Sequence, residues 1–97
     1  MDTVLTPTLV DEYLATLRPD EIAGMRRTHR DCPLARSLAR VTGHAASINR
    51  QEWVSGQTRG WTPLWAQMFI ARVDRTRGPI TARGARRLLR HVIDGGG

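Results

Sequence analysis

Prolines and glycines divide this chain into short segments, and this limits how long any helix can be. Pro33 and Gly43 bracket one segment, and Pro63 and the Gly78-Pro79 pair bracket another. Proline suits the first turn of a helix, where its missing N–H costs nothing, and glycine suits the left-handed position after the last turn. Arg18-Pro19 ends an earlier segment, because the residue before a proline is driven out of the α region. The sequence therefore predicts several short helices.

Apolar residues recur at helical spacing in five segments of the chain. We expect helices at about residues 8–17, 19–28, 33–42 and 63–75, and a fifth that begins after the Thr81 cap and has an apolar stripe reaching Ile93. Thr8 and Asp11 have the spacing of a capping box at the start of the first helix. Cys32 and Thr81 stand at the N-cap positions of the third and the fifth helix. The second helix has a thin apolar face, and Gly24 costs it about 1 kcal/mol relative to alanine.

From residue 44 to residue 56 the apolar residues follow the period of two that is typical of strands. Ala46 and Ile48 alternate with polar residues, and Asn49-Arg50 supplies a turn before the extended pattern resumes. We expect residues 57–60 to form a polar loop. The sequence thus predicts a mainly α (α+β) fold of about five short helices, with one small β-hairpin between the third and the fourth helix.

A chain of 97 residues supports one modest core. We expect a single compact domain over residues 1–94. Residues 95–97 are all glycine, and we expect them to form a flexible tail, because they have no side chains that could dock.

The charge of the chain is strongly positive. It has 15 basic and nine acidic residues, a net charge of +6, and every basic residue is arginine. Arginine makes bidentate contacts with phosphates and carboxylates, which favours a nucleic acid or an acidic protein as the partner. A GC-rich genome also favours arginine over lysine, but this explanation does not account for the excess of positive charge. The composition therefore predicts a polyanionic partner.

The sequence also predicts a cytoplasmic protein that does not enter a membrane. A single cysteine excludes an intramolecular disulfide and fits a reducing compartment. The longest uncharged apolar stretch, residues 61–71, is too short to span a bilayer. The N-terminal residues carry acids where a secretory signal would carry bases.

The strongest candidate for a binding surface is on the fifth helix. Arg83, Arg86, Arg87 and Arg90 have the spacing i, i+3, i+4 and i+7, which places them on one face. These guanidinium groups repel one another, and cations are disfavoured near a helix N-terminus. A bound polyanion would relieve both costs, and free amides of the helix start at Thr81 would add to its binding. A solvated face and a surface for an acidic protein remain alternatives.

A second set of arginines is compatible with a winged helix-turn-helix, in which the third helix reads nucleic acid. Arg36 and Arg40 lie on that helix, and Arg50 lies at the tip of the hairpin. The linker between the second and the third helix is longer than the standard turn of that motif. Three tryptophans fall between residues 53 and 65. We expect them to serve the core, although stacking on bases is the alternative.

Cys32 is the one candidate for thiol or metal chemistry. At a helix N-terminus, with His29 three residues before it, it could act as a nucleophile. Asp31 beside it would oppose thiolate formation, so we interpret Cys32 as a structural N-cap. A zinc site would need His44 and His91 as further ligands, and their separation does not fit paired, closely spaced ligands. The sequence therefore predicts no catalytic residue, no metal and no cofactor.

Two blocks of the sequence resemble a group of mostly uncharacterised proteins. CPLARSLARVTG (residues 32–43) and TPLWAQMFIARVD (residues 62–74) are similar to patterns in small proteins of high-GC actinobacteria and their phages. The blocks cover about a quarter of the chain. The resemblance implies a compact stand-alone domain of phage or mobile-element character, and it implies no activity, cofactor or catalytic residue.

These observations predict a small, non-enzymatic regulatory protein that contacts DNA or RNA through an arginine-rich helix face. The alternative is a protein–protein interaction module, such as a host-factor inhibitor or an assembly component, in which the same arginines contact an acidic partner.

Overall fold

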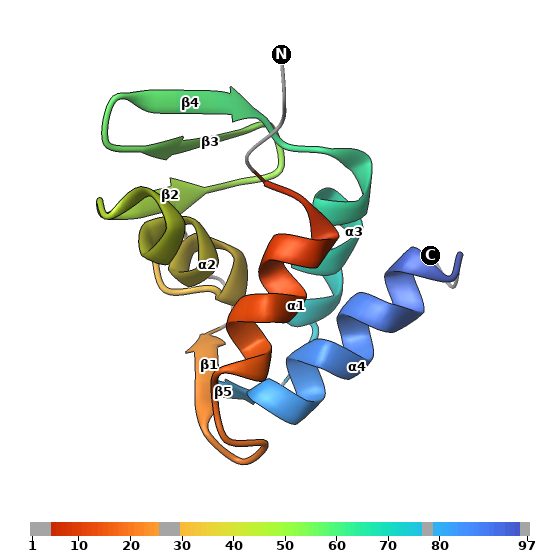
Figure 1. The fold of residues 1–97 in the computed structure, drawn as a ribbon. Coiled ribbons are helices and arrows are strands. Elements are labelled where there is room, and N and C mark those ends of the chain that lie inside the picture. The colour runs from red at the N-terminus through yellow and green to blue at the C-terminus, as the bar shows by residue number, and fades with distance from the viewer. Residues whose placement is uncertain (1–4, 26–29, 77–78, 96–97) are drawn as a thin grey trace.

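The computed structural model describes residues 5–25, 30–76 and 79–95, and it has an α+β fold (Figure 1). The expectation of a mainly α chain with five helices and one hairpin is wrong, since the described residues form four helices and two antiparallel sheets. The elements in chain order are α1 (Pro7–Ala15), β1 (Ile22–Met25), α2 (Pro33–Thr42), β2 (Ala46–Ile48), β3 (Glu52–Ser55), β4 (Thr58–Trp61), α3 (Leu64–Val73), β5 (Pro79–Thr81) and α4 (Ala82–Ile93).

Helix α1 begins two residues earlier than the capping-box pattern predicted. Thr6 is the N-cap, and its hydroxyl oxygen accepts a hydrogen bond from the backbone N–H of Leu9 at 3.1 Å. Pro7 follows at the first helical position, which its fixed backbone angle favours. Thr8 lies inside the first turn, so its spacing to Asp11 does not form a cap.

The helix predicted at residues 19–28 does not form, and part of this segment is a strand instead. Strand β1 pairs antiparallel with β5. The sequence analysis predicted neither of these strands. Glycine is required at position 24, because the backbone there lies against the start of α2. A Cβ atom at Gly24 would stand 2.6 Å from both the carbonyl oxygen of Asp31 and the nitrogen of Pro33. Residues 26–28 lie outside the described part of the chain.

Helix α2 confirms the prediction at both ends. Cys32 is its N-cap, Pro33 occupies the first helical position, and Gly43 ends it in the left-handed conformation with φ of 76°. The proline and the glycine therefore set the length of this helix.

The predicted hairpin is confirmed, but it belongs to a larger sheet. Strands β2 and β3 pair antiparallel, and β3 pairs in turn with β4, which gives the order β2-β3-β4. The polar loop expected at residues 57–60 is wrong, because Thr58–Trp61 is a strand. A two-residue turn joins β3 to β4, and Gly56 allows it by adopting a φ of 62°.

The helices lie between the two sheets, with the three-stranded sheet at the upper end of Figure 1 and the β1–β5 pair at the lower end. Helix α4 packs against α1 and α3, and α2 packs against α1 and against strands β1 and β2. The largest fully buried side chains include Leu5, Leu14, Leu34, Leu38, Phe69 and Leu89. The expectation of core tryptophans is confirmed for Trp53, which is buried, but it is wrong for Trp61, whose side chain is 81% exposed. Of the predicted tail, only Gly95 lies in the described residues.

Candidate anion-binding face

Helix α4, which carries the four arginines, packs through its apolar side against α1 and α3. Thr81 is the N-cap, as predicted, and its hydroxyl oxygen accepts a hydrogen bond from the backbone N–H of Gly84 at 3.1 Å. The buried residues of α4 recur at helical spacing and face α1 and α3; they are Ala82, Ala85, Leu89 and Val92. The opposite side of the helix is left to arginines.

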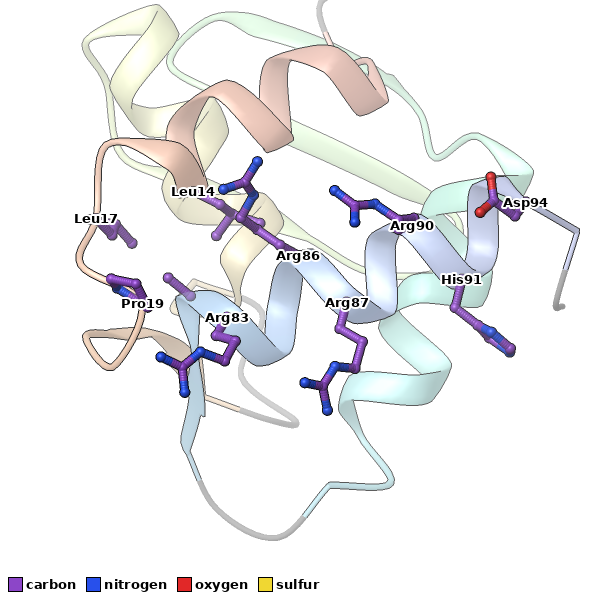
Figure 2. Close-up of a pocket in the computed structure, with 10 residues that line it drawn as sticks. Leu14, Leu17, Pro19, Arg83, Arg86, Arg87, Arg90, His91 and Asp94 are labelled. Atoms are coloured by element: carbon purple, nitrogen blue, oxygen red, sulfur yellow. The ribbon is translucent and has the colours of Figure 1, made fainter.

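The four predicted arginines form two rows on α4 (Figure 2). Arg83 and Arg87 extend away from α1, whereas Arg86 and Arg90 extend toward it. Arg83, Arg87 and Arg90 are exposed, and across the described residues no ion pair or hydrogen bond engages their side chains. The four arginines thus point to two sides of α4 and do not form the single stripe expected from the spacing, and three of their charges are not compensated within the described part of the chain.

Arg86 differs from the other three arginines. Its Nε lies 3.0 Å from Oδ1 of Asp11 on α1, and its second guanidinium nitrogen lies 3.5 Å from Oδ2. Both side chains are about two-fifths exposed, at 41% and 45%, so the pair is worth no more than about 1 kcal/mol. Asp11 thus neutralises one of the arginine charges on α4, and the sequence pattern did not identify this partner.

An open groove of about 580 Å³ runs beside these arginines. All four guanidinium-bearing side chains line it from α4, together with His91 and Asp94 at the end of the helix. Leu14, Leu17 and Pro19 form its apolar wall (Figure 2). The groove therefore presents cationic groups along one side and apolar carbon along the other, and the sequence analysis did not foresee the apolar side.

The start of α4 offers no free amide to an anion, contrary to the prediction. The backbone N–H of Ala82 donates to the carbonyl of Glu21 at 2.8 Å, and that of Arg83 donates to the carbonyl of Pro19 at 3.0 Å. The N–H of Gly84 is taken by the Thr81 hydroxyl. The loop between α1 and β1 and the N-cap thus occupy the amides that a phosphate would need. Any anion bound here is held by side chains.

The other predicted contact residues lie on different surfaces. Arg36 donates from Nε to Oδ1 of Asp31 at 2.7 Å and from a terminal nitrogen to the carbonyl of Ile22 at 3.1 Å. It therefore ties α2 to β1. Arg40 lines a separate groove with residues of α1, and Arg50 is exposed in the turn between β2 and β3. Neither Arg40 nor Arg50 lines the groove beside α4.

The structure supports the interpretation of Cys32 as a structural cap. The thiol is buried, and its sulfur accepts a hydrogen bond from the N–H of Ala35 at 3.4 Å. Burial raises the pKa of this thiol, and the nearby charges of Asp74 and Asp31 raise it further, while hydrogen bonds from the backbone of Ala35 and Leu34 lower it in part. The thiol form is thus favoured over the reactive thiolate.

His29, which the sequence offered as a partner for Cys32, lies outside the described residues. Of the other two candidate metal ligands, His44 follows α2 and His91 lies on α4, and both are exposed. Within residues 5–25, 30–76 and 79–95, no three His, Cys, Asp or Glu side chains come together to hold a metal ion.

Two exposed apolar side chains were not anticipated. Trp61 at the end of β4 is 81% exposed, and Leu64 at the start of α3 is 70% exposed. Residues 58–61 read Thr-Arg-Gly-Trp, which has no apolar alternation, so the sequence pattern carries no signal for this strand.

Comparison with known proteins gives no relative for this chain. No protein-family model, no curated protein and no solved structure matches it. Among the described residues, none of the helices has the length and the apolar character needed to cross a membrane.

Proposed function

We propose that this protein binds nucleic acid through the exposed face of α4, with Arg83, Arg87 and Arg90 on the phosphate backbone. The observation that carries the proposal is that these three guanidinium groups project from one helix without a partner in the described residues. Because they span seven residues of helix, they cover about 10 Å, a length over which a duplex offers several phosphates.

Such contacts would act mainly through counterion release. Each phosphate neutralised lowers the slope of log K against log salt by about 0.9, so three arginines predict a slope of about −3. Backbone contacts carry little sequence information, so this face would bind many sequences alike. The proposal includes the wider interpretation of a non-enzymatic, cytoplasmic regulatory protein of phage or mobile-element character.

The test is a titration of fluorescein-labelled duplex DNA and duplex RNA followed by fluorescence anisotropy. We expect binding at low salt that weakens about 40-fold between 50 and 200 mM salt, as a slope of about −0.9 for each of three phosphates requires. The variant Arg87→Gln with Arg90→Gln should reduce the slope by about 2 and weaken binding strongly. Glutamine is a good helix former, so α4 should remain folded.

The matched control is Arg40→Gln with Arg50→Gln, which removes the same charge from exposed positions on other elements. We expect this control to bind nearly as well as the parent protein. Equal losses in the two double variants would mean that net charge alone is responsible, and absence of binding at low salt would exclude the proposal.

An acidic protein segment is the second candidate partner, and the apolar wall of the groove favours it. A peptide with carboxylates and an apolar side chain could place the latter against Leu14 and Leu17. Titrations of the protein with polyglutamate and with the DNA duplex, at equal concentrations of negative charge, compare the two candidate partners. Tighter binding of the duplex favours nucleic acid, and tighter binding of polyglutamate favours an acidic protein segment. A Leu17→Ser variant should leave DNA binding unchanged, and it should weaken a partner that uses the apolar wall.

A further inference from the structure

Strand β4 is the outer strand of the three-stranded sheet, and its free edge is exposed. The strand order is β2-β3-β4, and three of the four residues of β4 are exposed while Gly60 is half-buried. Strand β4 lies at the upper edge of the sheet in Figure 1, remote from α4. An unpaired edge can accept a further strand.

The hydrogen bonds of the sheet show which backbone groups of β4 are available. The N–H of Thr62 donates to the carbonyl of Gln51 at 2.9 Å, and the register places Trp53 opposite Gly60. Since hydrogen-bonded and non-bonded pairs alternate in an antiparallel ladder, Gly60 points its backbone groups toward β3. The N–H and C=O groups of Arg59 and Trp61 therefore point to the free edge.

The side chains of Arg59 and Trp61 share the outer face of the sheet. They stand opposite Val54 and Glu52, whereas the buried Trp53 and Ser55 face inward. Arg59 also forms an ion pair with Glu52 at 3.0 Å, in which the arginine side chain remains 68% exposed. The free edge thus carries a cation and a large aromatic ring, two residues apart, beside backbone groups that no described residue pairs.

Two copies of β4 can pair antiparallel about a two-fold axis at any of the four residues of the strand without exchanging its faces. Centring on Thr58 sets Arg59 opposite Gln57 of the turn, so the paired segment is cut short. Centring on Arg59 sets two arginines directly opposite each other, which is destabilising. Centring on Trp61 sets Arg59 opposite Pro63 of the second copy, which has no N–H to donate. Centring on Gly60 sets Arg59 of each copy opposite Trp61 of the other.

We infer that two copies of this chain associate through β4, antiparallel, with Gly60 at the two-fold axis. In this register both Arg59–Trp61 pairs are hydrogen-bonded pairs, and each pair exchanges two backbone hydrogen bonds. The guanidinium of Arg59 lies against the indole of Trp61 from the other copy, a favourable cation–π arrangement. The two sheets become one continuous six-stranded sheet. Because the contact is small, the association is weak and reversible.

Sedimentation equilibrium tests the association from about 10 μM to about 1 mM protein, the range in which small interfaces form. We expect a monomer–dimer equilibrium that Trp61→Gln abolishes. Leu64→Gln is the matched control, because it removes a similarly exposed apolar side chain outside the strand. A chain that stays monomeric at all of these concentrations overturns the inference. This is also the result expected if the natural occupant of the edge is a strand of another protein or a nucleic acid base. Equal loss with Leu64→Gln also overturns the inference.

A disulfide trap tests the register. The variants Arg59→Cys and Trp61→Cys are mixed with glutathione buffer, and the native Cys32 does not interfere because it is buried. Opposed residues of a hydrogen-bonded pair have Cα atoms about 5.5 Å apart, which suits a disulfide, while identical positions lie beyond about 7 Å. We expect the mixed disulfide to exceed either homodimer at least tenfold. Predominance of the Arg59→Cys homodimer, or absence of any crosslink, contradicts the register.

Discussion

Gly60 and Trp53 fit closely against each other in the three-stranded sheet. They are direct neighbours on β4 and β3, and a Cβ atom at Gly60 would stand 2.8 Å from Nε1 of the indole. The ring of Trp53 thus covers the position where a side chain would be. The same nitrogen is buried without a hydrogen-bond partner in the described part of the chain. The ring of Trp53 thus packs against a glycine, and its buried N–H donates to no described group.

Gly60→Ala should lower the free energy of unfolding by about 1–3 kcal/mol, because the methyl group has to displace the indole. Urea denaturation of the two proteins measures the difference. In a Trp53→Val background the same glycine change should cost markedly less, since the obstructing ring is gone. If Gly60→Ala lowered the free energy of unfolding equally in both backgrounds, the strain would not come from the indole of Trp53.

Cys32 should be almost unreactive in the folded protein. Burial raises its pKa and keeps the thiol protonated, so iodoacetamide at pH 8 should modify the native chain far more slowly than the urea-unfolded chain. Mass spectrometry of timed aliquots measures both rates. Because the pKa is raised only in the folded state, the associated stability is present below the ordinary cysteine pKa of about 8.5 and is lost as pH rises above it. Rapid native alkylation would contradict this environment.

At the scale of elements, the helices with proline or glycine at their boundaries could be predicted. The strands β1 and β5, which pair only with a segment distant in sequence, could not. Local chemistry sets α2, since Pro33 and Gly43 define its ends. Strands β1 and β5 are short and pair across more than 50 residues of chain, so no local pattern reveals them. Gly24 was read from the sequence as a weakness in a helix, whereas it is required by the close approach of backbone near Asp31.

The contact between α1 and α4 yields a prediction about binding. Asp11 neutralises Arg86, so Asp11→Asn should release this guanidinium and raise the affinity for duplex DNA several-fold at low salt. Glu12→Gln is a matched control with the same change in charge on the adjacent, exposed residue. Anisotropy titrations measure both variants.

We expect Asp11→Asn to increase binding more than Glu12→Gln, at a cost in stability below about 1 kcal/mol. Indistinguishable affinities would mean that Arg86 takes no part. Sequence reasoning could place Arg86 among the arginines of the helix, but it could not pair it with a residue 75 positions away.

At the scale of the whole molecule, the two proposed contact surfaces are on different parts of the fold. Helix α4 packs against α1 and α3, whereas β4 belongs to the sheet at the other end of the molecule (Figure 1). Loss of one contact should therefore leave the other intact. The arginine pattern of α4 was visible in the sequence because helical spacing is local. The exposed edge at Trp61 was not, because its exposure depends on the order of the strands.

The occupied amides at the start of α4 bear on which anions the proposed arginine face would bind. With the N–H groups of Ala82 and Arg83 bound to backbone carbonyls, the start of α4 has no cluster of free amides that could enclose a single small ion. Separate guanidinium groups along a helix should instead bind a ligand more tightly the more linked phosphates it has. Each additional phosphate on the same strand binds at a high effective concentration. Inorganic phosphate should therefore compete no better than its ionic strength predicts, while a short oligonucleotide should gain affinity with each added nucleotide until the length of the helix is covered.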